Sequence, residues 1–198
     1  MIDLLLRLPT WPLIRVAGLV SYYLMFIGIA LGILYGLPSL RGKAKQRIYQ
    51  WHSRFQSAGV LAVLVHVMLL AIDRYMPFDW DQLLIPFSYP QHRAAYGFGS
   101  LAMYGLLIIL LTTDFRSLLP RRLWLAIHLS AYPFFLLAML HGLFSGTDTR
   151  EPLVFAGYVA TAAGLVLLTV IRGIADRAKQ APSAPASASS RSRSNPLH

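Results

Sequence analysis

The sequence predicts an all-α membrane protein, a bundle of about five transmembrane helices. Of its 198 residues, 56% are hydrophobic and only 13% are charged, a balance too apolar for a soluble domain of this length. No segment has the strand-sized alternation of a membrane β-barrel. Five apolar stretches are long enough to cross a hydrocarbon core of about 30 Å, which takes about 20 helical residues. We expect these spans at residues 11–37, 50–72, 94–113, 123–145 and 152–172.

The basic residues predict how the bundle lies in the membrane. Most of them follow the first, third and fifth stretches, namely Arg41, Lys43, Lys45, Arg47, Arg116, Arg121, Arg122, Arg172, Arg177 and Lys179. Because cytoplasmic loops are enriched in Lys and Arg, we expect the N-terminus outside and the C-terminus in the cytoplasm, as in a bacterial inner-membrane protein. The net charge of +10 flanks apolar segments and does not form one basic face. Membrane lipid, and not nucleic acid, is therefore the expected partner.

The segments outside the spans divide the chain further. Residues 1–10 lack the pattern of a signal peptide and are expected to form a short interfacial segment. Residues 11–172 form the membrane domain. Residues 173–198 become rich in Ser, Ala and Pro and are expected to be a disordered cytoplasmic tail. The loop from Asp73 to Arg93, rich in aromatic residues and proline, is suited to an ordered cap on the outer side.

Four histidines lie inside the predicted spans, where ionisable groups are rare. His52 and His66 are 14 residues apart on the second span, which places them ~21 Å apart and ~40° from alignment. His128 and His141 are 13 residues apart on the fourth span, or ~20 Å. Both spans start at a cytoplasmic loop and so run the same way. We expect His52 to meet His128 near the cytoplasm, as an inner pair, and His66 to meet His141 as an outer pair.

The fourth span needs a local change of direction for this pairing. In an ideal helix, 13 residues leave His128 and His141 ~140° apart in projection. Pro133 lies between them and lacks the amide that should bond the carbonyl of Leu129. We therefore predict a kink or a change of winding near Pro133 that rotates the outer half of the helix.

The two pairs favour haem over other cofactors. The chain has no cysteine, which excludes iron–sulfur clusters, thiol redox chemistry and c-type haem attachment by this chain alone. Two facing imidazoles suit the axial positions of a six-coordinate haem. The two histidine pairs are expected to lie ~20 Å apart, so their four ring nitrogens cannot all bind one zinc ion. Three glycines at four-residue spacing, Gly28, Gly32 and Gly36, clear one face of the first span. They indicate either close helix–helix contact or a surface for a porphyrin edge.

The pattern resembles the ferric reductase-like transmembrane domain shared by NADPH oxidases, ferric reductases and metalloreductases. The resemblance covers residues 11–172 and rests on the histidine spacing, with Trp51-His52-Ser53-Arg54 and the run from His128 to His141 at the ligand positions. It implies that the four histidines bind two b haems and that electrons pass from a cytoplasmic flavin to an outside acceptor. It also places a basic residue near Arg15. Arg15 is then expected either to pair with a propionate of the outer haem or to extend to the lipid headgroups. Arg54 is expected either to support the inner haem in the same way or to act as one of the basic residues that fix the cytoplasmic side of the protein.

The chain departs from the large members of this family. They have six spans and continue into flavin and nicotinamide domains, whereas no Gly-rich dinucleotide loop is present here. A separate flavoprotein reductase or a quinol is therefore the expected electron donor. The architecture is similar to the haem subunit of bacterial periplasmic methionine sulfoxide reductase systems. The common form of that subunit lacks the inner histidine of the first pair, which is present here as His52.

These observations predict a haem-dependent oxidoreductase, or its electron-transfer subunit, that carries electrons across the membrane. The candidate acceptors, in order, are ferric complexes, a periplasmic reductase partner and dioxygen. Two alternatives remain open. One is a quinol-linked cytochrome b subunit of a larger dehydrogenase. The other is a non-redox transporter or proton relay that uses intramembrane histidines.

Overall fold

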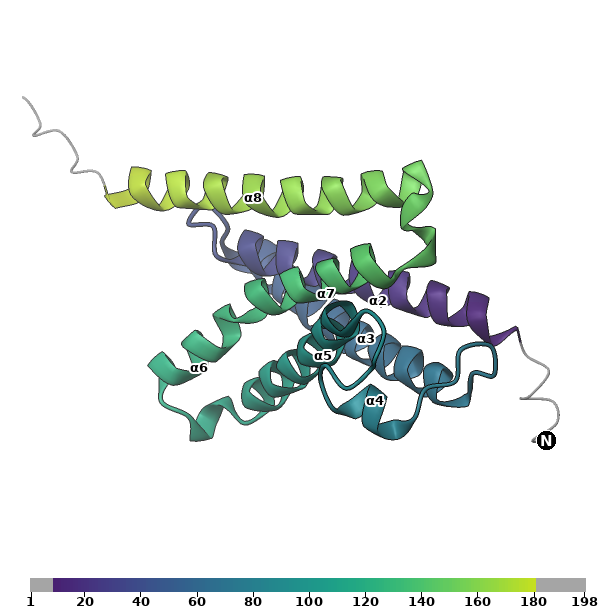
Figure 1. The fold of residues 1–198 in the computed structure, drawn as a ribbon. Helices are drawn as coiled ribbons and strands as arrows, with labels where there is room; N and C mark the ends of the chain where they lie inside the picture. The colour runs from purple at the N-terminus through teal and green to yellow at the C-terminus, as the bar shows by residue number, and fades with distance from the viewer. Residues whose placement is uncertain (1–8, 181–198) are drawn as a thin grey trace, which may run out of the picture.

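The computed structural model describes residues 9–180, which form helices and loops without strands (Figure 1). Five helical segments are long and apolar enough to cross a membrane, which confirms the predicted number of spans. They are α2 (Thr10–Tyr35), α3 (Gly42–Ile72), α5 (Arg93–Asp114), α6 (Arg121–Leu129) with α7 (Ala131–Ser145), and α8 (Pro152–Gln180). The interfacial segment predicted for residues 1–10 lies mostly outside the described residues, and residues 181–198 of the predicted tail lie wholly outside them.

Two helices are longer than the hydropathy pattern predicts. Helix α3 begins at Gly42 instead of residue 50, and α8 continues to Gln180 instead of ending at residue 172. Both extensions contain basic residues, such as Lys43 and Arg177, and lie on the predicted cytoplasmic side. Backbone hydrogen bonds continue a helix beyond the hydrocarbon core, where charged side chains are solvated, so hydropathy alone underestimates its length.

The fourth span is interrupted at Ser130, between α6 and α7. The Ser130 hydroxyl donates to the Ile127 carbonyl at 2.5 Å and closes the end of α6. Three residues later Pro133 has no N–H for the Leu129 carbonyl, so the helical ladder cannot run straight through. The predicted irregularity near Pro133 is confirmed as an interruption of the helix at Ser130.

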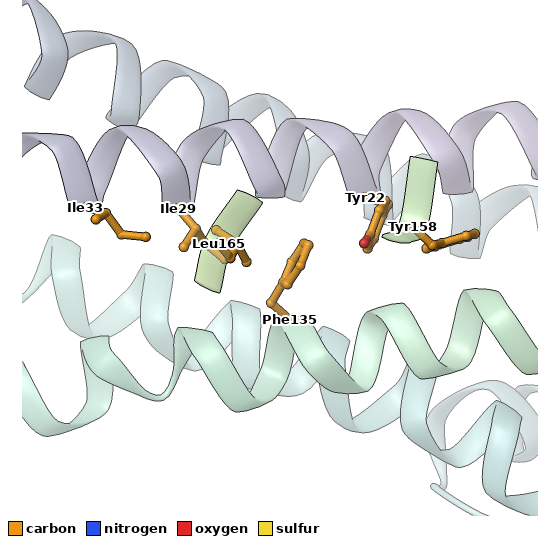
Figure 2. Packing of buried hydrophobic residues seen from close by; sticks show 6 residues of the cluster. All are labelled: Tyr22, Ile29, Ile33, Phe135, Tyr158 and Leu165. Atoms are coloured by element: carbon orange, nitrogen blue, oxygen red, sulfur yellow. The ribbon is translucent and has the colours of Figure 1, made fainter. Parts of the chain in front are cut away.

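The centre of the bundle is a cluster of buried apolar and aromatic side chains between α2, α7 and α8 (Figure 2). It consists of Tyr22, Ile29, Ile33, Phe135, Tyr158 and Leu165. In Figure 2, Phe135 extends from α7 toward α2, and the ring of Tyr22 stacks on it with centroids 5.0 Å apart. Many large apolar side chains on the outside of the bundle are exposed, as expected for a lipid-facing surface.

Helix α8 lies along one side of the bundle and contacts α2 (Figure 1). The hydroxyls of Tyr22 and Thr161 form a buried hydrogen bond of 2.5 Å between the two helices. The Tyr23 hydroxyl lies directly against Gly157, where any side chain would collide with it. Small residues and interhelical hydrogen bonds are the usual means by which membrane helices associate.

The loop between α3 and α5 is ordered and contains α4 (Trp80–Leu84). The buried ring of Phe78 packs against Tyr89 and Tyr96, with centroids 4.9 Å and 5.4 Å away. The Tyr104 hydroxyl donates to the Leu84 carbonyl at 2.5 Å and ties α4 to α5. The prediction of an ordered cap is confirmed, and this cap covers the end of the bundle nearest to the outer pair.

Candidate functional site

The four intramembrane histidines meet in the predicted pairs. The ring centroids of His52 and His128 are 6.1 Å apart, and those of His66 and His141 are 6.5 Å apart. The planes within the pairs are inclined by 72° and 77°. The change of winding at Ser130 therefore brings both ends of the α6–α7 span into register with α3.

The separation within each pair fits one metal ion between two imidazoles. A ring nitrogen lies about 2 Å from a bound metal and about 1.1 Å from its own ring centre, so two rings on one axis have centroids about 6 Å apart. Among residues 9–180, no three His, Cys, Asp or Glu side chains come together as a bare-ion site. Two opposed nitrogen ligands, with the remaining positions supplied by a porphyrin, are the donor set of a bis-histidine haem.

Three of the histidines are oriented by hydrogen bonds to backbone carbonyls. Nδ1 lies 2.7 Å from the Gly28 oxygen in His52, 2.9 Å from the Ile14 oxygen in His66, and 2.8 Å from the Ala95 oxygen in His141. A carbonyl oxygen can only accept, so in each ring Nδ1 carries the proton and donates. Nε2 therefore keeps its lone pair for a metal, as is usual for metal-binding histidines.

Each of these three rings also rests against a glycine of the neighbouring helix. The glycines are Gly18 beside His66, Gly32 beside His52 and Gly99 beside His141. Our sequence reasoning did not assign Gly18 or Gly99 to the site. A signal was present, since Gly18 and Gly32 are 14 residues apart, the same separation as His52 and His66.

Gly28, Gly32 and Gly36 form a glycine stripe along α2, and side chains of neighbouring helices pack against it. Added Cβ atoms at Gly28, Gly32 and Gly36 would meet Gln56, His52 and Arg172, respectively. This arrangement favours the first of the two interpretations, close contact between helices. The stripe also has a function in the site, because it lets the His52 ring reach the backbone of α2.

His128 is held differently from the other three histidines. Its Nδ1 is buried and has no hydrogen-bond partner in the described part of the chain. The ring instead stacks on Trp124, with centroids 5.1 Å apart and planes inclined by 22°. One member of the inner pair is thus oriented by stacking rather than by a backbone carbonyl.

His141 has a second acceptor in Ser145. The Ser145 hydroxyl donates to the His141 carbonyl at 2.5 Å, so its oxygen is free to accept from His141 Nδ1 at 3.2 Å. The Nδ1–H of His141 is therefore shared between Ser145 and the Ala95 carbonyl. The outer pair has the more extensive hydrogen-bonding support.

One continuous cavity of about 690 Å³ joins both histidine pairs. All four histidines line it, and its remaining wall is mainly apolar and aromatic, with Leu19, Met25, Phe134 and Phe135 among its residues. Its size is within the range of about 300–1,000 Å³ typical of ligand pockets. An elongated, largely apolar space with ligands at two levels suits flat macrocycles stacked across the membrane.

The two predicted arginines occupy different surroundings. Arg15 lines the cavity and forms an ion pair with Asp148, which follows α7 in the short helix η2 (Thr147–Arg150). Arg15 directly follows Ile14, whose carbonyl accepts from His66, so it lies at the outer end of the cavity. Arg54 is exposed, lies over the ring of Trp51 at 5.3 Å, and is not among the residues that line the cavity.

Other basic residues line the inner end of the cavity. Arg116, Arg121 and Arg172 belong to this wall, and our sequence reasoning assigned them only to membrane topology. The guanidinium of Arg172 lies against Gly36, at the end of α2. Positive side chains therefore border both ends of the cavity.

Comparison with known proteins agrees with a haem-binding membrane protein. The chain is 27% identical, over 152 residues, to the protein-methionine-sulfoxide reductase heme-binding subunit MsrQ of Rhodospirillum rubrum. The aligned region covers 71% of this chain and 70% of the relative. No family model matches the chain, and no solved structure matches it. The similarity is distant, and the five apolar helices support an integral membrane protein.

Proposed function

We propose that this protein is a transmembrane electron-transfer cytochrome that holds two b haems, one between the rings of each histidine pair. The observation that carries the proposal is the spacing of 6.1 Å and 6.5 Å within two pairs that line one cavity. When bound, the haems supply one-electron redox chemistry. The similarity to a subunit named as heme-binding supports the choice of cofactor.

The residues of the chain fix the ligands and limit the chemistry. Hydrogen bonds to the carbonyls of Ile14, Gly28 and Ala95 hold three rings in the tautomer that leaves Nε2 free. With His52 and His128 assigned to one haem and His66 and His141 to the other, the groups would supply electron transfer rather than oxygen binding. The wall around them is mainly apolar.

The electron path runs from the predicted cytoplasmic side, at the inner pair, to the predicted outer side, at the outer pair. A flavoprotein reductase or a quinol is the donor we propose, and residues 9–180 themselves form helices and loops without a dinucleotide-binding fold. The relative is named as a subunit of a protein-methionine-sulfoxide reductase, and this supports a reductase partner as the acceptor we propose first, ahead of ferric complexes and dioxygen.

Electron transfer across sealed vesicles tests this function. Purified protein in proteoliposomes, with a membrane-impermeant reductant inside and an impermeant ferric complex outside, is expected to reduce the external iron. His141→Ala should abolish this transfer. His92→Asn is the matched control, because His92 is exposed, does not line the cavity and has a φ of 51°, which Asn tolerates.

The opposite results would reject the proposal. Protein that carries no haem, or a His141→Ala variant that reduces external iron as fast as the wild type, would leave the histidines without a redox function. Colourless protein that nevertheless transports a metal or protons would instead support the non-redox alternative.

A further inference from the structure

Three of the four histidines dock on their neighbouring helix in one repeated way. In each case Nδ1 donates to the carbonyl of one residue, and the ring lies against the glycine four positions later. The carbonyl and glycine pairs are Ile14 with Gly18, Gly28 with Gly32, and Ala95 with Gly99. Four residues are about one helical turn, so the missing Cβ opens the path from the ring to the carbonyl beneath it.

The repeat predicts where the fourth histidine should dock. Gly18 and Gly32 are 14 residues apart on α2 and receive the two histidines of α3. On α5, the position 14 residues after Gly99 is Thr113, and its carbonyl partner by the same rule is Ile109. Thr113 lines the same cavity as His128. A β-branched residue thus stands where the repeat requires glycine.

The hydrogen bonding around Thr113 agrees with the idea that this residue keeps the His128 ring away from the Ile109 carbonyl. Both Thr113 Oγ1 and His128 Nδ1 are buried and have no hydrogen-bond partner within residues 9–180. The Thr112 hydroxyl donates mainly to the Ile108 carbonyl at 2.7 Å and lies 3.2 Å from the Ile109 carbonyl, to which His128 would donate by analogy. An unpaired buried polar group is unfavourable, so the sequence tolerates a destabilising arrangement here.

We propose that Thr113 is a positioning residue that raises the redox potential of the inner haem above that of the outer haem; this inference rests on the proposed function. An imidazole that donates its second N–H becomes a more basic ligand, which stabilises oxidised iron and lowers the potential. Both ligands of the outer pair donate, and His141 does so to two acceptors. In the inner pair only His52 donates.

The charges at the two ends of the cavity act in the same direction. Arg116, Arg121 and Arg172 border the inner end together with Asp114, and Arg172 also lies 3.7 Å from Asp176, so an excess of positive charge remains there and favours the reduced, less positive state of a nearby iron. At the outer end the charge of Arg15 is neutralised by Asp148. A single electron shared between the two sites therefore resides on the inner one.

Potentiometric titration of the purified two-haem protein tests this proposal. The wild type is expected to show two midpoint potentials. In a His141→Ala background only the inner haem remains, which assigns the higher potential to it. Thr113→Gly is expected to lower that potential toward the value of the outer haem, because His128 can then reach the Ile109 carbonyl.

Two further substitutions separate the backbone space from the hydroxyl group. Thr113→Ala should shift the inner potential in the same direction by a smaller amount, since a Cβ at Gly18, Gly32 or Gly99 would lie 2.7–3.2 Å from the histidine ring and therefore keeps the ring farther from the carbonyl than glycine does. It also provides the test if the glycine variant is unstable. Thr113→Val keeps the branched Cβ without the hydroxyl and should leave the potential unchanged.

Each other outcome overturns the inference. A shift in Thr113→Val as large as that in Thr113→Gly would mean that the hydroxyl itself is the partner of His128. Unchanged potentials in the glycine and alanine variants, with two haems still bound, would reject the role of Thr113 and leave the proposed function standing. Wild-type protein without haem would reject both.

Discussion

Replacing Gly99 by alanine is expected to disrupt the outer haem site while leaving the fold intact. A Cβ at Gly99 would lie 2.7 Å from His141 Nδ1, whereas nonbonded contact requires about 3.5 Å, so the ring must move away from α5 by about 0.8 Å. The hydrogen bond to the Ala95 carbonyl would then lengthen from 2.8 Å to about 3.6 Å, beyond the range of a hydrogen bond.

The corresponding substitutions at Gly18 and Gly32 provide matched controls. There a Cβ would lie 3.1 Å and 3.2 Å from the nearest ring atom, so displacements of about 0.3–0.4 Å suffice. The bonds of 2.9 Å and 2.7 Å would lengthen to only about 3.0–3.3 Å and survive. All three changes favour helix formation by about 0.5–1 kcal/mol, so general destabilisation would not explain a difference.

Loss of a hydrogen bond behind a metal ligand typically weakens metal binding about 10–100-fold, or about 1.4–2.7 kcal/mol. We therefore expect Gly99→Ala to weaken binding at the outer pair by about this factor, and Gly18→Ala and Gly32→Ala to have clearly smaller effects. The assay is haem retained per chain during serial dilution in detergent, with a monodisperse elution profile as the folding control. Equal haem retention in all three variants would refute the role assigned to the glycine positions.

Three further predictions concern the ligands, the arginines and the packing of α8. His141→Ala should remove one haem of two, measured as haem per chain, and loss of both or neither would contradict independent pairs. Arg15→Gln should loosen the outer haem more than Arg54→Gln loosens the inner one in the same dilution assay, because only Arg15 lines the cavity; equal effects would contradict this. Tyr22→Phe removes the hydrogen bond to Thr161 and should lower stability by about 1 kcal/mol, seen as a reduced Tm in detergent, whereas an unchanged Tm would show that this bond contributes little.

The spans and the histidine pairing could be predicted from the sequence because both follow from helix geometry. Hydropathy located five segments, and a shared direction of two of them put their histidines at matching levels. The interruption of the fourth span could also be predicted. The 13-residue spacing of His128 and His141, together with Pro133, required the change of direction that is found at Ser130. The helical ends beyond the membrane could not be predicted, because hydropathy marks only the apolar part of a helix and these ends contain charged residues such as Lys43.

The groups that support the histidines were beyond sequence reasoning for a physical reason. Backbone carbonyls such as that of Ala95 exist at every position, so no residue type marks the acceptor. Glycines in a membrane helix are common, and only contact with a ring distinguishes Gly99 from other glycines. Likewise, Thr113 becomes informative only once the repeated docking of the other histidines is known.

The most direct measurement is the number of b haems per chain in purified protein, determined by the pyridine haemochrome assay together with low-temperature EPR of the oxidised iron. Two low-spin haems with bis-imidazole signals are expected, since each histidine pair has the separation that one iron requires. Colourless protein, or a high-spin signal from both sites after expression with ample haem, would contradict the assignment.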